Sequence, residues 1–175
     1  MVLRYNGSVY LHHHAREGTV GLVGGKKDPI YENGEIVGYE SDEVAVCREF
    51  REETGCAIRI HSTSERNAEL TDNVTDYPVH IVDTIITGKT KVFIADLLGD
   101  TPLDLQAWRQ NEKETAGIYA VCVEDIINHD GGETMKVVVP CSAKSEPVIE
   151  RVLPIRKCAI RTLEILKNYF KGCRV

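Results

Sequence analysis

Two runs in the first part of the chain have the pattern of β-hairpins. Each combines β-branched and aromatic residues and is interrupted by a pair of residues that favours a tight turn. The runs are residues 2–14, interrupted by Asn6-Gly7, and residues 80–97, interrupted by Gly88-Lys89. Shorter apolar runs predict further strands over residues 20–23, 57–63 and 135–139.

A helix is predicted over residues 41–54. Ser41 is suited to cap its N-terminus, and Gly55 is suited to end it. At the helical period of 3.6 residues per turn, one side is largely apolar. That side is formed by Val46, Cys47, Phe50 and Thr54.

A second helix is predicted over about residues 153–171, because apolar residues recur there at helical spacing. These residues are Ile155, Ala159, Leu163, Leu166 and Phe170. We expect this helix to pack on the face of the sheet opposite the first helix. The elements together predict a single α/β domain over residues 1–175, with a mixed β-sheet between helices. Residues 128–147 are interpreted as either an edge hairpin or an interface.

Composition narrows the class of protein. The chain of 175 residues is 42% hydrophobic and 27% charged, which is ordinary for a folded domain. The net charge of −6 argues against a protein whose main function is to bind nucleic acid through its phosphates. No run reaches the length of a membrane span, and we expect no membrane partner. Six scattered cysteines predict a reducing, cytoplasmic location, and four are expected to be buried: Cys47, Cys56, Cys122 and Cys158.

The other side of the first helix carries three carboxylates. Glu49, Glu52 and Glu53 are spaced at i, i+3 and i+4, so their side chains are neighbours that repel one another. Carboxylate oxygens are the ligands that Mg²⁺ and Mn²⁺ prefer, which suggests a metal site for phosphate chemistry. The alternative is a solvated helix face with loose ion pairs, such as Arg48 with Glu52.

The spacing of residues 34–56 favours the metal site, because it resembles the signature box of the Nudix (MutT-like) hydrolases. A chance match in a chain of this length is below about one in a million at average residue usage. Cys56 at the final apolar position is a mild variant. The matching fixed residues are Gly34, Glu40, Arg48, Glu49, Glu52, Glu53 and Gly55.

The resemblance implies an α/β/α sandwich that cleaves the pyrophosphate link of a nucleoside diphosphate joined to another group. Glu49, Glu52 and Glu53 stand at the family's metal-ligand positions for Mg²⁺ or Mn²⁺, with Glu53 the most important. Arg48 and Glu40 stand at positions that orient these carboxylates, as metal ligands generally require.

One departure from the family pattern concerns the glycines before the helix. The family's Gly-Gly pair, whose first carbonyl is a metal ligand, matches Gly24-Gly25, upstream of the usual place. Either Gly34 is the structural glycine of the box, or Gly25 is and residues 26–39 are an insertion. We favour the insertion. This loop is then either a determinant of substrate choice or a surface hairpin with an Asn33-Gly34 turn.

Several candidates lie outside the box. Glu114, or Glu112, matches an acidic residue that completes the metal site or acts as base in the family. His13 or His14 would approach substrate phosphates, or they are exposed at a strand end. His12 and His14 should share one face of their strand, and His13 the other. Lys26, with its neighbour Lys27, would touch the leaving phosphate or lie in solvent.

The expected substrate is a small nucleotide, with a nucleoside triphosphate first because the motifs of other substrate groups are absent. Cleavage would give a monophosphate and pyrophosphate. The alternatives are ADP-ribose, a nucleotide sugar, a dinucleoside polyphosphate or a capped or triphosphate RNA end. A rival of another class is a Nudix module that binds a nucleotide without cleaving it. The oligomeric state stays open.

Overall fold

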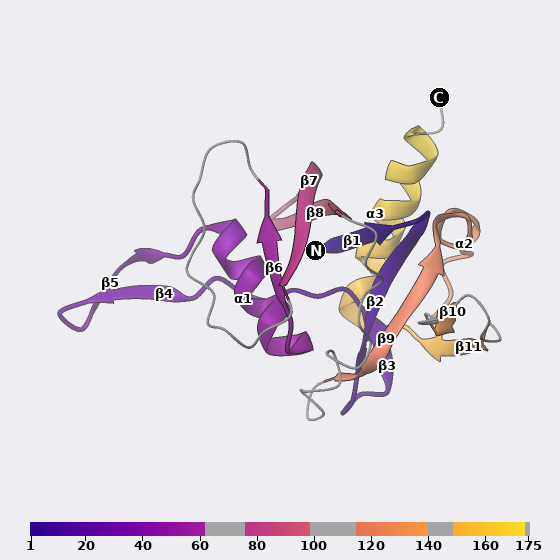
Figure 1. Ribbon diagram of the computed structural model, residues 1–175, viewed down its shortest axis with the longest axis horizontal. Helices are drawn as coiled ribbons and strands as arrows, with labels where there is room; N and C mark the ends of the chain where they lie inside the picture. The colour runs from indigo at the N-terminus through magenta and orange to yellow at the C-terminus, as the bar shows by residue number, and fades with distance from the viewer. Residues whose placement is uncertain (62–75, 99–114, 140–148, 174–175) are drawn as a thin grey trace.

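The computed structural model describes residues 1–61, 76–98, 115–139 and 149–173, and it has a mixed α/β architecture (Figure 1). The strands are β1 (Val2–Tyr5), β2 (Ser8–His14), β3 (Thr19–Gly21), β4 (Pro29–Glu32), β5 (Glu35–Tyr39), β6 (Ala57–Ile60), β7 (Asp76–Thr87), β8 (Thr90–Leu97), β9 (Thr115–Cys122), β10 (Thr134–Val139) and β11 (Ile149–Pro154). The helices are α1 (Asp42–Thr54), α2 (Val123–Asn128) and α3 (Lys157–Gly172). None of these helices is both long and apolar enough to cross a membrane.

Strand β2 lies at the centre of the main sheet. The strand order is β11-β10-β9-β2-β1-β8-β7-β6, and β3 also pairs with β2. Two pairs of neighbours, β1 with β8 and β6 with β7, are parallel, whereas the other pairs in this sheet are antiparallel. The sheet is therefore mixed, as the sequence predicts. The C-terminal half of β2 lies between β3 and β9, which fixes the orientation of its histidines.

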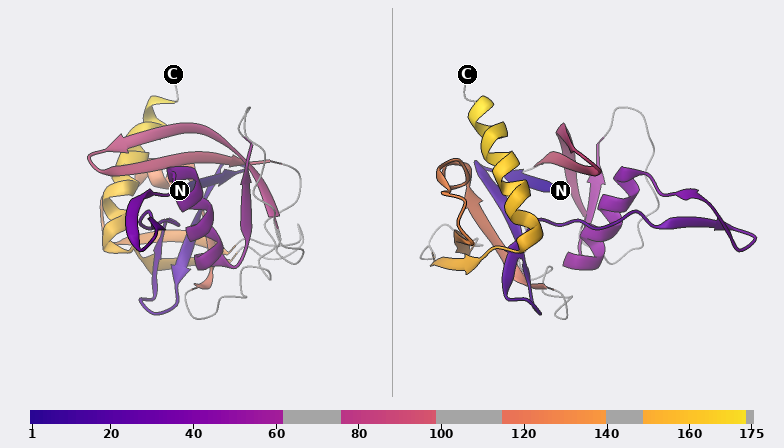
Figure 2. Two further views of the ribbon diagram at one scale, coloured as in Figure 1. Left: turned by 90° about the vertical axis from the view of Figure 1, so that its left-hand side faces the viewer. Right: turned by 180° about the vertical axis from the view of Figure 1, so that it is seen from behind.

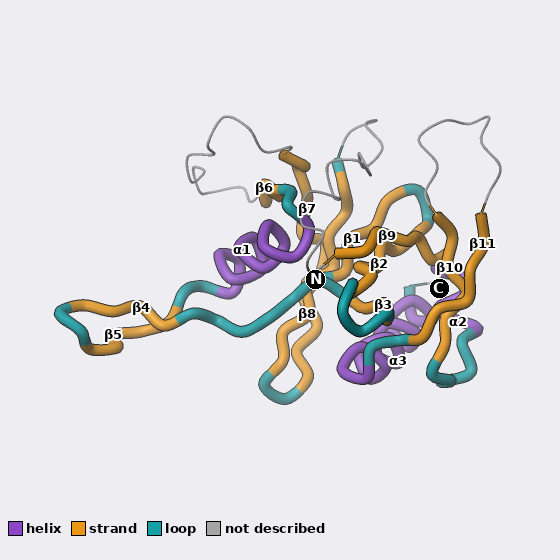
Figure 3. Tube along the Cα trace, turned by 90° about the horizontal axis from the view of Figure 1, so that it is seen from below, coloured by secondary structure: helices purple, strands orange, loops and turns teal. Residues whose placement is uncertain are grey.

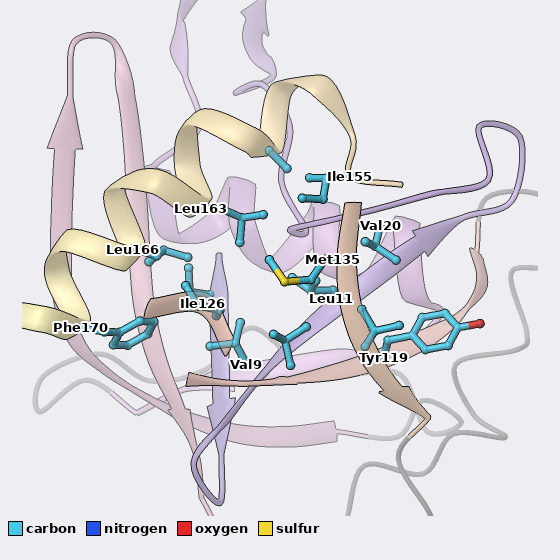
Figure 4. Packing of buried hydrophobic residues seen from close by; sticks show 14 of the residues in the cluster. Val9, Leu11, Val20, Tyr119, Ile126, Met135, Ile155, Leu163, Leu166 and Phe170 are labelled. Carbon is cyan, nitrogen blue, oxygen red and sulfur yellow. The ribbon is translucent and has the colours of Figure 1, made fainter. Parts of the chain in front are cut away.

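The sheet has an apolar core on each face. In β1, Val2 belongs to the cluster under α3, whereas the next residue, Leu3, belongs to the cluster under α1. Consecutive strand residues point to opposite faces, so α1 and α3 cover opposite faces, as predicted. Figure 4 shows Leu163, Leu166 and Phe170 of α3 packing on the residues of β2 and α2.

The hairpins predicted over residues 2–14 and 80–97 are confirmed, and residues 26–39 contain the hairpin that was one of the two alternatives for that loop. Asn6 and Gly7 have φ of 48° and 75°, and Asn33 and Gly34 have φ of 51° and 86°. Left-handed φ at both central residues is the requirement of the turn that joins twisted antiparallel strands. Residues 26–39 thus contain a surface hairpin, β4–β5, and Gly34 lies in its turn.

The predicted start of the last helix is wrong. Residues 149–154 form β11, which pairs with β10, and α3 begins only at Lys157. A proline disfavours helical backbone at the residue before it, so Pro154 keeps Leu153 extended.

The short helix α2 was not predicted. The strand expected over 57–63 ends at Ile60, and β7 begins at Asp76, four residues before the hairpin predicted over 80–97.

The cysteine prediction is correct only in part. Cys56 is fully buried and Cys47 is half-buried in the core under α1, but Cys122 and Cys158 are exposed. Cys122 precedes α2 at the end of β9, and Cys158 lies in the first turn of α3, where neither side chain faces a core. Their apolar neighbours in sequence therefore did not indicate burial.

The β4–β5 hairpin forms a two-stranded sheet of its own and projects from the body as an arm (Figures 1 and 2). Figure 3 shows from below that the arm extends past α1, away from the main sheet. Its apolar side chains are exposed, including Tyr31 at 61% and Tyr39 at 60%. The arm therefore contributes little buried apolar area to the fold.

We predict that replacing residues 30–38 by a short Gly-Ser linker leaves the melting temperature within about 2 °C of the wild type. The matched control is Phe50→Ala in the core under α1, which should cost about 3–5 kcal/mol of unfolding free energy. Thermal unfolding followed by circular dichroism measures both. A drop for the shortened loop as large as for the control would contradict the prediction.

Candidate functional site

Helix α1 packs its apolar side on the sheet, and its ends are capped as predicted. The Ser41 hydroxyl accepts a hydrogen bond from Val44 N at 3.2 Å, and Gly55 ends the helix with φ of 74°. Phe50 and Thr54 are buried, which fixes the rotation of the helix on the sheet. The acidic residues then differ in environment. The exposed fraction of the side chain is 17% for Glu49, 55% for Glu52 and 10% for Glu53.

Arg48 gathers the carboxylates on the outer part of this site. Its guanidinium lies 2.7 Å from Glu40, 3.1 Å from Glu49 and 2.9 Å from Glu52. It also contacts Asp28 at 3.2 Å and donates a hydrogen bond of 2.7 Å to the carbonyl of Lys26. The hydrogen bonds from Arg48 hold the pKa of Glu40 below its usual value. Arg48 therefore ties the loop before the helix to two of the three glutamates.

The glycine pair lies directly against the glutamates. The Gly24 N–H donates to Glu53 Oε2 at 3.3 Å. A Cβ at position 25 would lie 1.9 Å from Glu49 Oε1, so only glycine fits there without moving that carboxylate. Gly34, in contrast, has open space around it at the tip of the arm.

Glu53 is the buried member of the acidic group. Burial raises the pKa of its carboxyl to about 7, and the neighbouring charge of Glu49 acts in the same direction. The Gly24 N–H, Arg156 and the N-terminus lower this pKa, each by less than burial raises it. Ionising the Glu53 carboxyl in this buried position therefore lowers the stability of the fold.

Two histidines of β2 lie on the same side as Glu53. The rings of His12 and His14 have centroids 4.2 Å apart, and His12 Nδ1 lies 3.8 Å from Glu53 Oε2. His13 points the other way and contacts the Tyr119 ring edge-on at 5.5 Å. The predicted alternation is confirmed, but His14 is buried, so its interpretation as an exposed strand end is wrong.

His12 was missed as a site residue by sequence reasoning. The alternation along β2 indicates that His12 and His14 share a face, but not which element covers that face. Glu53, the acidic residue near His12, belongs to helix α1 and lies 39 residues after His14 in the sequence. The contact depends on how α1 packs on the sheet, and no local pattern encodes it.

The remaining candidates are placed as follows. Lys26 is exposed in the loop after the glycines, and its carbonyl accepts the hydrogen bond from Arg48. Lys27 is 3.3 Å from Asp42, at the start of α1. His13 does not reach the glutamates. Glu112 and Glu114 lie outside the described residues.

A groove of about 440 Å³ opens beside the glycine pair, between the β7–β8 turn and α3. Its cationic lining residues are Lys89, Lys91, Arg156 and Arg161. Lys91 is paired with Asp42 at 2.9 Å, and Arg156 with Glu17 at 3.1 Å. In the described ranges no ion pair involves Lys89 or Arg161. The groove is thus suited to an anionic group.

Comparisons with known proteins place no further constraint on this site, since no family model, curated protein or solved structure matches the chain.

The environment of Glu53 predicts a pH-dependent stability. Because its folded pKa lies above that of an unfolded glutamate, its ionisation destabilises the fold progressively as pH rises from about 4.3 to 7. Glu53→Gln removes this cost. We expect the variant to melt at least about 2 °C above the wild type at about pH 8, and at nearly the same temperature at about pH 4.

The measurement is a series of thermal unfolding curves across this pH range, with a chelator present. Glu52→Gln is the matched control, because Glu52 is largely exposed and its charge costs little. A Glu53→Gln variant that is less stable than the wild type at the higher pH would contradict the assignment of a buried, costly carboxylate.

Proposed function

We propose that this chain is a divalent-metal-dependent pyrophosphohydrolase of the Nudix (MutT-like) type, with the α/β/α sandwich of that family. The observation that carries the proposal is the convergence of Arg48, Gly25 and the glutamates of α1 on one site. The motif from Glu40 to Gly55 predicts that Arg48 and the glutamates converge, and chance matches of a sequence pattern do not require it. In this arrangement Gly25, rather than Gly34, lies against the glutamates.

The donor set supports a hard divalent cation. Glu49, Glu52 and Glu53 would hold Mg²⁺ or Mn²⁺, and the resemblance adds the carbonyl of Gly24. The environment of Glu53 fits this role, because a nearby cation would offset the cost of its buried charge. When bound, such an ion neutralises phosphate charge and lowers the pKa of a water molecule that it coordinates.

The residues around the ligands have separate tasks. Arg48 and Glu40 keep Glu49 and Glu52 oriented, because a guanidinium fixes carboxylates in planar geometry. Gly25 allows the loop backbone to approach Glu49. The general base is proposed to be Glu114 or Glu112, from the resemblance alone.

A nucleoside triphosphate is the proposed substrate, cleaved to a monophosphate and pyrophosphate. The groove next to Gly24 and Gly25 supports an anionic substrate, since Lys89 and Arg161 line it without carboxylate partners in the described residues. These cations would bind phosphate oxygens or a leaving pyrophosphate.

The substrate class is tested with a panel of nucleotides and Mg²⁺ or Mn²⁺, with the products separated by chromatography. Release of monophosphate and pyrophosphate from a triphosphate supports the proposal. Cleavage of only a linked diphosphate, such as ADP-ribose or a nucleotide sugar, keeps the chemistry but contradicts the substrate. Binding without turnover of any compound favours the non-catalytic module.

We predict that Glu49→Gln and Glu52→Gln each lower kcat of Mg²⁺-dependent hydrolysis by roughly 100-fold or more, because each removes a charged metal ligand. Glu43→Gln is the matched control. It changes an exposed glutamate of the first turn of the same helix and should leave kcat within about twofold. Equal activity of all three variants would contradict the metal site.

A second prediction concerns the glycine pair. Gly25→Ala would force the Glu49 carboxylate to move, so we expect the Mg²⁺ affinity to fall by about 10- to 100-fold. Gly24→Ala retains the carbonyl, and its Cβ would meet nothing closer than 3.8 Å. It should bind Mg²⁺ nearly as the wild type does. Calorimetric titration of both variants measures this difference, and the reverse order of affinities would refute the assigned geometry.

A further inference from the structure

Three buried side chains converge on the inner side of α1, next to the proposed magnesium site. His12, His14 and Glu53 are only 1%, 8% and 8% exposed. Each offers one atom able to bind a metal, and these atoms lie within 4.8 Å of one another. Two imidazoles and a carboxylate that converge in this way match the donor set of a transition-metal ion.

We propose that His12, His14 and Glu53 form a binding site for a transition-metal ion of the Zn²⁺ class, which shares Glu53 with the proposed Mg²⁺ site and differs from it in its two histidine ligands. Two imidazoles and a carboxylate suit Zn²⁺, Fe²⁺ or Co²⁺, whereas Mg²⁺ prefers oxygen ligands alone. The inference goes beyond the proposed hydrolase activity, because it concerns metal binding and needs no substrate.

The fold holds the two histidines in place through β2. Pairing with β3 on one side and β9 on the other fixes the strand, and the alternation of side chains directs His12 and His14 to the face covered by α1. Glu53 is oriented by the hydrogen bond from Gly24 N. A site supported by rigid elements and a second hydrogen-bonded partner is typical of metal ligands.

The distances are compatible with a shared ion after a small adjustment. The 3.8 Å between His12 Nδ1 and Glu53 Oε2 is too long for a hydrogen bond. Two ligands at about 2.1 Å from one ion lie roughly 3–4 Å apart, depending on geometry. Side-chain movements of about 1 Å would therefore bring all three ligand atoms around one ion.

Arg156 competes with a metal ion for His14. Its Nη1 lies 3.2 Å from His14 Nε2, and a guanidinium can only donate, so the histidine nitrogen accepts. A neutral imidazole has a single unprotonated nitrogen, which a metal ion would also need. On metal binding Arg156 would leave His14 and keep its two contacts to Glu17. The site is thus expected to bind more tightly when Arg156 is removed.

The test uses Zn²⁺ titrations near neutral pH, measured by calorimetry. The Glu49→Gln/Glu52→Gln double variant retains the three proposed ligands and should still bind Zn²⁺. Introducing His14→Asn should weaken this binding by about 100-fold or more, since one of three ligands is lost. The matched control is His13→Asn, one position away on the opposite face, which should leave the affinity unchanged.

Arg156→Ala provides a gain-of-affinity test. We expect roughly 5- to 10-fold tighter Zn²⁺ binding, because a competing hydrogen bond and a positive charge are both removed. Zn²⁺ binding that His13→Asn and His14→Asn weaken equally, or that neither weakens, would overturn the proposal.

A measurement on the wild-type chain covers the case in which His14→Asn fails to fold. Co²⁺ is added, and visible absorption together with histidine ¹⁵N resonances of the Zn²⁺-loaded protein identifies the ligands. Ligand-field bands and shifts of two histidine rings support the site. A thiolate charge-transfer band would assign the ion to an exposed cysteine and overturn it.

The outcome is separable from that of the proposed function. Zn²⁺ binding through His14 with no hydrolysis of any nucleotide would refute the hydrolase and support this site. Mg²⁺-dependent hydrolysis by a chain that does not bind Zn²⁺ through His14 would refute this site and leave the hydrolase standing.

Discussion

The site depends on one cation, Arg48, placed among carboxylates that would otherwise repel one another. Its guanidinium contacts Glu40, Glu49, Glu52 and Asp28, so a single positive charge is shared by four negative ones. Arg48 can orient these groups but cannot neutralise them. The remaining negative charge suits the acidic side of α1 to the divalent cation proposed there, which would offset the repulsion among glutamates at i, i+3 and i+4.

The main sheet supplies the histidines of the site, which lie on β2. Strand β2 carries histidines toward both faces: His12 and His14 lie on the face under α1, where His12 is near Glu53, and His13 lies on the other face against Tyr119. The glycine loop that follows β3 then closes over the same region, with Gly24 on Glu53 and Gly25 on Glu49. Elements that are distant in sequence thus meet because α1 is held on the sheet by its apolar side.

Local features of the fold were predictable from the sequence, whereas contacts between elements were not. The capping of α1 by Ser41 and Gly55 depends on neighbouring backbone groups, so the sequence around the helix indicates both ends. Gly34 satisfies the motif spacing, yet it lies in a hairpin turn. Spacing along the sequence could not show this, because it does not distinguish a motif glycine from a glycine in an inserted loop. The burial of Glu53 beside His12 arises from helix-on-sheet packing, which no spacing rule contains.

Glu53 belongs both to the local sequence pattern of α1 and to the contacts between α1, the glycine loop and β2. It stands on the acidic side of α1 in sequence, but the glycine loop and β2 cover it, so that it borders both the carboxylates around Arg48 and the histidines. Burial makes the ionised carboxylate costly, and a fold selected for stability alone would replace it by an apolar residue. A cation bound on the acidic side or between the histidines, as proposed, would offset this cost. In both proposals, the stability of the metal-free protein and the affinity for a metal ion are opposing consequences of the same buried charge.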